Sequence, residues 1–169
     1  MQILAIDPGT EKSGWVLYEP TEMRICQCGI DINQTVMNLV RTEIDPDTYL
    51  VAEQISCQGM AVGQETFDTV EFLGAILYAA LGNNGWDRRH DFTVKRQKVK
   101  THLCGSARAK DANIRQAIID RFPPTGGGKC RQIGTKKQPG PLYGVKSHCW
   151  SALAVAITWY ETTLFKDEI

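Results

Sequence analysis

The sequence predicts an α/β domain with a central mixed five-stranded sheet flanked by helices. An aliphatic run at residues 3–6 ends in Asp7-Pro8-Gly9, as expected of a buried strand that stops at a turn, because proline cannot donate to a sheet ladder. Strand-like segments at 14–18 and 24–32 follow with no room for a helix between them. The first three strands are therefore expected to form an antiparallel meander.

The other elements follow from composition and periodicity. Two further strands are expected at 49–54, which again ends in an acid, and at 91–94. Helices are expected at 33–42, 66–81, 111–122 and 145–164, with a helical turn at 97–103. The glycines and asparagines of 82–85 are expected to end the second of these helices. We predict one domain over 1–169, with a mobile loop at 123–144 able to close over a ligand.

Charge is unevenly distributed along the chain. The 169 residues carry 19 Lys and Arg against 19 Asp and Glu, which excludes a globally basic protein that coats DNA. Residues 86–137, however, hold 14 basic and four acidic residues. Such a segregated positive stripe is typical of proteins that bind a polyanion, although a solvated face of mixed charges is an alternative.

Cysteine spacing and hydropathy bear on the cellular compartment. The six cysteines form no CxxC pair and no zinc-type spacing. The first residues lead directly into a strand, without the pattern of a signal peptide, and no apolar run approaches the roughly 18 residues of a membrane span. We expect a cytoplasmic protein with reduced thiols and no membrane association.

Two acids are the main candidates for chemistry. Asp7 and Glu53 each end a buried strand, and ligands bind at the carboxyl ends of strands in open α/β sheets. If the two strands are neighbours, the two carboxylates meet, and a divalent cation such as Mg²⁺ relieves their repulsion. The alternative is two unrelated acids that face solvent.

Other polar residues lie near predicted helix starts. His148 precedes Ser151 by one helical turn on the same face, so His148 is a candidate metal ligand or, alternatively, a surface residue. Asp111 is expected mainly as the N-cap of its helix. Basic side chains suited to DNA phosphates are Lys95, Arg96, Lys98, Lys100, Arg108 and Lys110.

Four motifs occur in a fixed order along the chain. They are Ile-Leu-Ala-Ile-Asp-Pro-Gly-Thr at 3–10 with Ser-Gly-Trp at 13–15, Val-Ala-Glu-Gln at 51–54, the segment 99–105 with Ala109, Lys110 and Ile114, and Ser-Ala-Leu-Ala-Val-Ala at 151–156. In this order they resemble the RuvC-type Holliday junction resolvases of the RNase H-like nuclease superfamily, particularly the phage-borne relatives. The resemblance covers nearly the whole chain except 123–144.

The resemblance implies a homodimer that cuts two strands of a four-way DNA junction by metal-activated water, with two Mg²⁺ or Mn²⁺ ions. The family's first two acids map to Asp7 and Glu53, and its last helix carries two acidic positions three residues apart, the first of which is His in some members. Here these positions are His148 and Ser151. The fourth carboxylate is therefore absent, and the protein anchor of a second ion with it.

Three other functions remain open at this stage. Asp-Pro-Gly-Thr also resembles the phosphate loop of actin-like sugar kinases, although those need two copies of such a domain. A non-catalytic protein that binds branched DNA would be consistent with the missing acid. A broader nuclease that trims flaps or replication forks is the third alternative.

Overall fold

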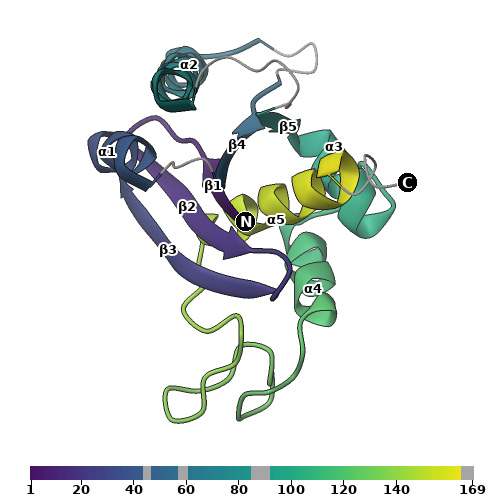
Figure 1. Cartoon of the computed structure of the whole chain (residues 1–169). Coiled ribbons are helices and arrows are strands. Elements are labelled where there is room, and N and C mark those ends of the chain that lie inside the picture. The colour runs from purple at the N-terminus through teal and green to yellow at the C-terminus, as the bar shows by residue number, and fades with distance from the viewer. Residues whose placement is uncertain (44–46, 57–60, 85–91, 165–169) are drawn as a thin grey trace.

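The computed structural model describes residues 1–43, 47–56, 61–84 and 92–164. Its sheet has the order β3-β2-β1-β4-β5 (Figure 1). The strands are β1 (Gln2–Asp7), β2 (Lys12–Glu19), β3 (Arg24–Ile32), β4 (Thr48–Gln54) and β5 (Thr93–Lys95). The first three pair antiparallel, whereas β4 pairs parallel with β1 and β5 parallel with β4. The predicted mixed sheet and its meander are confirmed.

Helices occupy the predicted positions with shifted ends. They are α1 (Asn33–Glu43), α2 (Gln64–Asn84), α3 (Arg96–Cys104), α4 (Asp111–Arg121) and α5 (His148–Trp159), followed by a π-helical segment, Tyr160–Leu164. The helical turn expected at 97–103 is a helix of nine residues. The last helix begins at His148 instead of 145, because Ser147 has a φ of 42° that no helix continues. The expected stop at Gly85 and strand residue Asp91 lie outside the described residues.

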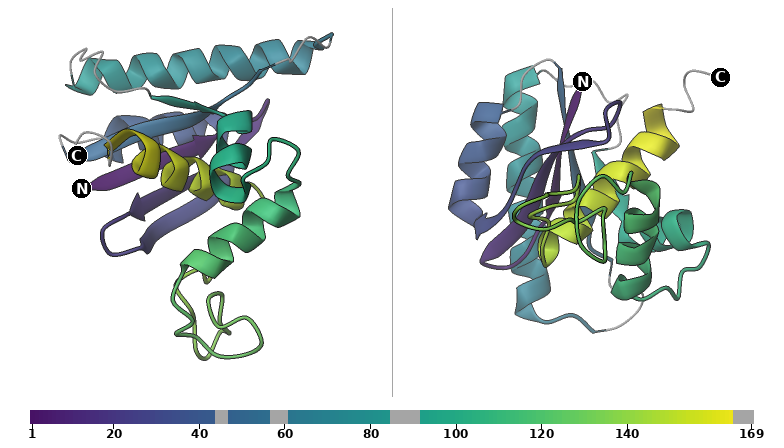
Figure 2. Two further views of the ribbon diagram at one scale, coloured as in Figure 1. Left: turned by 90° about the vertical axis from the view of Figure 1, so that its right-hand side faces the viewer. Right: turned by 90° about the horizontal axis from the view of Figure 1, so that it is seen from below.

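The sheet is covered by helices on both faces (Figures 1 and 2). Along β1, Leu4 and Ile6 pack in the cluster that includes residues of α1 and α2, whereas Ile3 and Ala5 pack in the cluster that includes residues of α3, α4 and α5. This alternation follows from the two-residue period of a strand. None of the helices in the described part of the chain is long and apolar enough to cross a membrane.

Helix α5 is the most buried helix next to the sheet. Residues 152–156 are fully buried, and three of these five residues are alanines whose small side chains permit close packing. The prediction that this stretch packs against the sheet is confirmed, because α5 contacts β1, β2 and β4. The free thiols of the described part are Cys26, Cys28, Cys104, Cys130 and Cys149.

The segment between α4 and α5 projects from the body of the domain as an arm (Figure 2). Its backbone is hydrogen-bonded to itself, for example from the Gly126 N–H to the Arg131 carbonyl at 2.8 Å and from the Gly140 N–H to the Ile133 carbonyl at 3.0 Å. Leu142 anchors its return in the core with no exposed surface. The mobility expected for 123–144 stays a prediction.

Candidate functional site

Asp7 and Glu53 end adjacent parallel strands. The register pairs Ile6 with Ala52, so the two acids come next at the same edge of the sheet. Strand alternation also turns both toward the α5 face, because Ala5 and Val51, two residues earlier, pack there. The expectation that these two strands are neighbours is confirmed.

His148 joins this edge from the first turn of α5. Its Nδ1 lies 3.0 Å from Asp7 Oδ2, while its side chain stays 64% exposed. Gly14, the β2 partner of Asp7, makes this approach possible, because a Cβ on Gly14 would lie 2.5 Å from the Cβ of His148. The positive φ of Ser147 turns the chain into α5 directly before His148, and such backbone strain is concentrated at functional sites.

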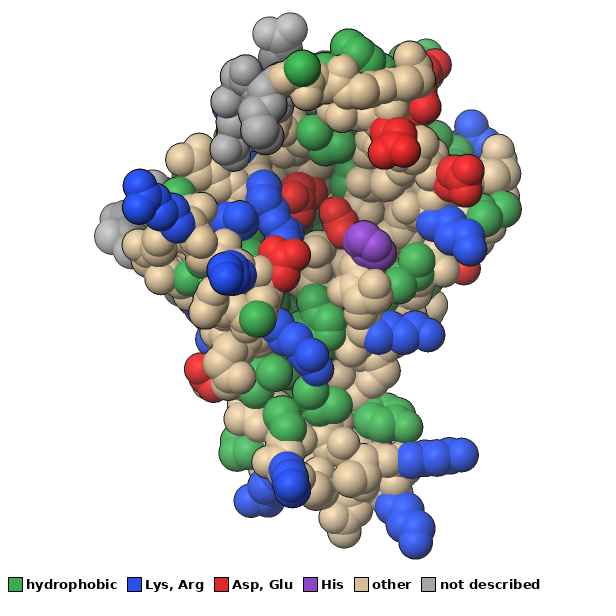
Figure 3. Space-filling model, turned by 180° about the vertical axis from the view of Figure 1, so that it is seen from behind, with side chains coloured by type: hydrophobic (Ala, Val, Ile, Leu, Met, Phe, Trp, Pro, Cys, Tyr) green, Lys and Arg blue, Asp and Glu red, His purple; other side chains and the backbone are tan. Residues whose placement is uncertain are grey.

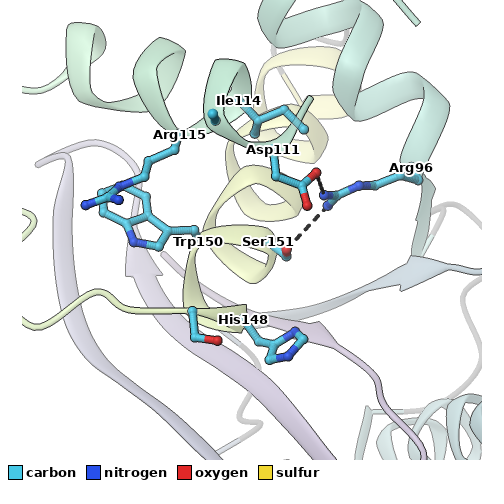
Figure 4. Close-up of a pocket in the computed structure, with 9 residues that line it drawn as sticks. Arg96, Asp111, Ile114, Arg115, His148, Trp150 and Ser151 are labelled. Atoms are coloured by element: carbon cyan, nitrogen blue, oxygen red, sulfur yellow. Dashed lines mark hydrogen bonds and ion pairs between the residues drawn. The ribbon is translucent and has the colours of Figure 1, made fainter. Parts of the chain in front are cut away.

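Arg96, the first residue of α3, reaches into the same edge (Figure 4). Its guanidinium lies 3.0 Å from Glu53 Oε2 and 3.4 Å from Ser151 Oγ, and its other terminal nitrogen donates to Asp111 Oδ1. The Arg96 side chain is 23% exposed. Sequence analysis grouped Arg96 with phosphate-binding residues, and its ion pairs with two acids were not foreseen.

Burial perturbs both strand-end acids. Removal from water raises the pKa of Glu53 to about 7, although the nearby Arg96 charge works in the opposite direction. The pKa of Asp7 is also raised by burial, against the hydrogen bond and charge of His148. Two neighbouring carboxylates whose pKa values are raised by removal from water are typical of a functional site.

Asp111 has a different structural role from the one expected. The N-cap of α4 is Lys110, whose N–H donates to the Asn113 side chain at 2.9 Å, and Asp111 is the first helical residue. The N-cap prediction was therefore wrong by one residue, since Asn113 supplies the capping oxygen. The carboxylate of Asp111 is directed to Arg96 instead (Figure 4).

A cavity of about 360 Å³ opens beside these groups. Arg96, Asp111, His148 and Ser151 line it, so the sequence-predicted pair His148 and Ser151 does share one face. The remaining lining residues are Ala112, Ile114, Arg115, Ser147 and Trp150. The Arg115 guanidinium stacks 5.0 Å from the centre of the Trp150 ring (Figure 4). This pair was not predicted from the sequence, because Trp150 fits a core position of its helix and Arg115 is one of many charged residues in the basic stripe.

The side chains at this edge are of the types that a hard divalent cation prefers as ligands. Mg²⁺ is commonly held by one or two carboxylates with water and substrate phosphate completing its shell, and Asp7 and Glu53 are such a pair. His148, in contact with Asp7, adds an imidazole nitrogen at the same edge. Among the described residues, no group of three or more His, Cys, Asp or Glu side chains is gathered closely enough to hold a metal. Glu53 is instead paired with Arg96.

Basic side chains lie on the elements next to this edge. Figure 3 shows acids and a histidine in a hollow with Lys and Arg side chains on its rim. The basic residues predicted to contact phosphate, apart from Arg96, lie on β5, on α3 or in the segment that leads to α4. They are Lys95, Lys98, Arg108 and Lys110, which are exposed, and Lys100, which is half-buried. Their contact with DNA stays a prediction.

Two solved structures of RuvC from Thermus thermophilus have the same fold. The first, titled "Thermus thermophilus RuvC structure", is 19% identical over 95% of each chain, with a TM-score of 0.59. The second, titled "T. thermophilus RuvC in complex with Holliday junction substrate", is 21% identical over 95% of this chain and 94% of that chain, also with a TM-score of 0.59.

These comparisons define the class of fold. The chain has the RNase H-like fold of RuvC-type resolvases, as the order of its motifs predicted. No protein-family model and no curated protein sequence matches it. The resemblance to phage-borne members stays a prediction.

Proposed function

We propose that the chain is a metal-dependent, structure-selective DNA endonuclease that resolves four-way junctions by hydrolysing paired phosphodiester bonds. The observation that carries the proposal is the convergence of half-buried Asp7 and buried Glu53 at one sheet edge beside His148. The basic side chains on the rim support a nucleic-acid substrate. The fold is shared with a protein whose structure was solved with a Holliday junction.

Each site residue has a role in this reaction. Asp7 and Glu53 would hold a divalent cation, which supplies a Lewis acid that lowers the pKa of bound water and offsets phosphate charge. His148 is oriented by Asp7 through Nδ1, and its mostly exposed ring is free to take a proton from the attacking water. The water oxygen bonds to phosphorus as the bond to the 3′ oxygen breaks, and that oxygen takes up a proton from solvent.

The pKa of Glu53 predicts how metal binding depends on pH. Glu53, with a pKa of about 7, must lose its proton to bind a cation. We therefore expect metal affinity to fall below neutral pH. Cleavage should need Mg²⁺ or Mn²⁺, because the proposed mechanism uses a metal-activated water. The family resemblance implies two ions, whereas the pair Asp7 and Glu53 is the proposed carboxylate set of one ion.

The protein is proposed to act as a homodimer, since symmetric cleavage needs two sites. Helix α2 is the candidate interface, because it exposes Phe67 (59%), Val70 (47%) and Tyr78 (79%). Sedimentation of the chain alone tests this. A monomer at micromolar concentration would contradict it.

The test of function is incubation of a labelled four-way junction with the protein in EDTA, Mg²⁺ or Mn²⁺. We expect paired nicks with either ion and none in EDTA. Linear duplex, flap and fork substrates of the same sequence are the controls. Equal cleavage of flaps and forks would indicate the broader structure-selective nuclease instead.

A second candidate is a non-catalytic protein that binds branched DNA. The observation in its favour is that Ser151 lies where the family has an acid, while the Glu53 carboxylate is already paired with Arg96. Junction binding without nicking in either metal would support this alternative.

A further inference from the structure

The guanidinium of Arg96 lies at the centre of the candidate site. It contacts Glu53 near the end of β4, Ser151 on α5 and Asp111 on α4, three elements that are distant in sequence. Figure 4 shows the contacts with Ser151 and Asp111. It is the group that joins Glu53 to the wall formed by α4 and α5. Two ion pairs and a hydrogen bond hold the guanidinium at this place.

The place of this guanidinium coincides with the place of a missing ligand. By the resemblance, position 151 carries an acid in the family, and a cation held jointly by acids at 53 and 151 would lie between them. Here one terminal nitrogen of Arg96 lies 3.0 Å from Glu53 Oε2 and 3.4 Å from Ser151 Oγ, so it lies between these two side chains. The chain therefore lacks the family's acid at position 151 and has the positively charged guanidinium of Arg96 beside that position.

Charge balance leads to the same conclusion. Asp7, Glu53 and Asp111 are three carboxylates against the single guanidinium of Arg96, so two negative charges remain when all are ionised. One divalent cation neutralises them. A second would leave the site with two excess positive charges before the substrate arrives, at the electrostatic cost of like charges a few ångströms apart.

We propose that Arg96 takes the place of the second metal ion, so that the site binds one divalent cation and uses the guanidinium as its other positive charge. Asp111 holds the terminal nitrogen of the guanidinium that Glu53 does not contact, and the Arg96 N–H groups not used by the acids are available to a phosphate oxygen in the cavity. This proposal rests on the metal-dependent nuclease function proposed above.

The first experiment counts ions on the intact wild-type protein by titration with Mn²⁺, followed by electron paramagnetic resonance. We expect one Mn²⁺ per chain. Two Mn²⁺ per chain with Arg96 in place would overturn the inference and leave the nuclease function standing. No bound Mn²⁺, together with no cleavage, would contradict the proposed function itself.

The second experiment removes the resident cation. Arg96→Ala is expected to bind its Mn²⁺ about tenfold more tightly, because a nearby positive charge is gone, while cleavage falls about 100-fold or more. A residue with only a structural role would not move affinity and rate in opposite directions. Metal affinity and rate that fall together would contradict the proposal.

A double variant restores the family's donor set. Arg96→Ala with Ser151→Asp is expected to bind two Mn²⁺ per chain, and a count of one would overturn the inference. Arg24→Ala is the matched control, because Arg24 also pairs with a carboxylate, that of Glu22, but lies on β3 outside the site. It should keep a count of one. If either Arg96 variant fails to fold, the wild-type count still decides.

Discussion

The two ends of α5 each meet a cluster of histidine, arginine and carboxylate, and the clusters differ in charge balance. At the C-terminal end, Glu161 accepts from Arg121 at 2.6 and 2.8 Å and lies 2.5 Å from His102 Nε2. At the N-terminal end, three carboxylates meet one guanidinium and one imidazole. The first cluster has no negative surplus, and the second has one.

Surroundings separate the clusters further. Glu161 connects the π-helical segment to α3 and α4 through its ion pairs. None of the three residues of this cluster lines the described cavity. Three residues of the other cluster, Arg96, Asp111 and His148, line that cavity, and burial raises the pKa values of its two further acids, Asp7 and Glu53. The same residue types therefore join helices through ion pairs at one end of α5. At the other end they leave a negative charge that a cation could neutralise. The candidate site thus differs from the Glu161 cluster in its negative surplus beside an open cavity and not in its residue types.

The largest effect is expected for Asp7→Asn. Loss of one carboxylate from the surplus cluster should lower cleavage by about 10³-fold, equivalent to several kcal/mol of lost electrostatic stabilisation, because the cation loses a ligand. Junction binding should stay within about twofold, since the basic rim is intact. Single-turnover cleavage and gel-shift titration measure the two quantities. Normal cleavage by Asp7→Asn would show that the surplus cluster is not the catalytic site.

The next effect concerns pH and Glu53. Unfolded Glu53 loses its proton near pH 4.5, whereas the folded residue retains it to about pH 7, so folded wild-type protein binds the extra proton between these values. Its free energy of unfolding should therefore fall as pH rises through this window, by about 2–3 kcal/mol, and then level off. Glu53→Gln should lack this slope. Denaturant titrations in EDTA from pH 4.5 to 8 measure the difference, and parallel curves would contradict it.

A smaller effect is expected at the Glu161 cluster. Glu161→Gln removes a charged acceptor from Arg121 and should lower the free energy of unfolding by about 1–2 kcal/mol. Cleavage measured below the unfolding transition should be unchanged. Loss of cleavage in a fully folded Glu161→Gln protein would break the distinction between the two clusters.

The smallest effect is expected on the basic rim. Lys100→Ala should weaken junction binding several-fold for all sequences and reduce the slope of log affinity against log salt by about 0.9, as for one lost phosphate contact. Arg24→Ala, outside the stripe, is the control and should leave the slope unchanged. An effect confined to one junction sequence would indicate base contact instead of phosphate contact.

The sequence predicted what depends on local signals. Asp7 and Glu53 were found because each follows an aliphatic strand and precedes the point where the chain must turn. The partnership of His148 with this edge followed from family motifs and not from spacing alone. The sheet, its meander and the packing of α5 were likewise predicted from periodicity.

Ion pairs across elements were not predictable in this way. Arg96 meets Asp111 because α3 and α4 are neighbours in space, and nothing in the basic run 95–100 separates Arg96 from its exposed neighbours. The start of α5 was missed because a serine with positive φ is rare. These features depend on tertiary packing, which decides where side chains converge.

Substitution of Gly14 is expected to abolish the proposed activity while every acid of the site is kept. A methyl group at this position would act as a wedge, because it would come within 2.5 Å of the Cβ of His148 and force α5 away from Asp7. All the proposed ligands would then be present, but His148 would no longer be aligned with Asp7. Gly14→Ala is thus a candidate for trapping the protein on an uncut junction in the presence of metal, a state that removal of a ligand cannot provide.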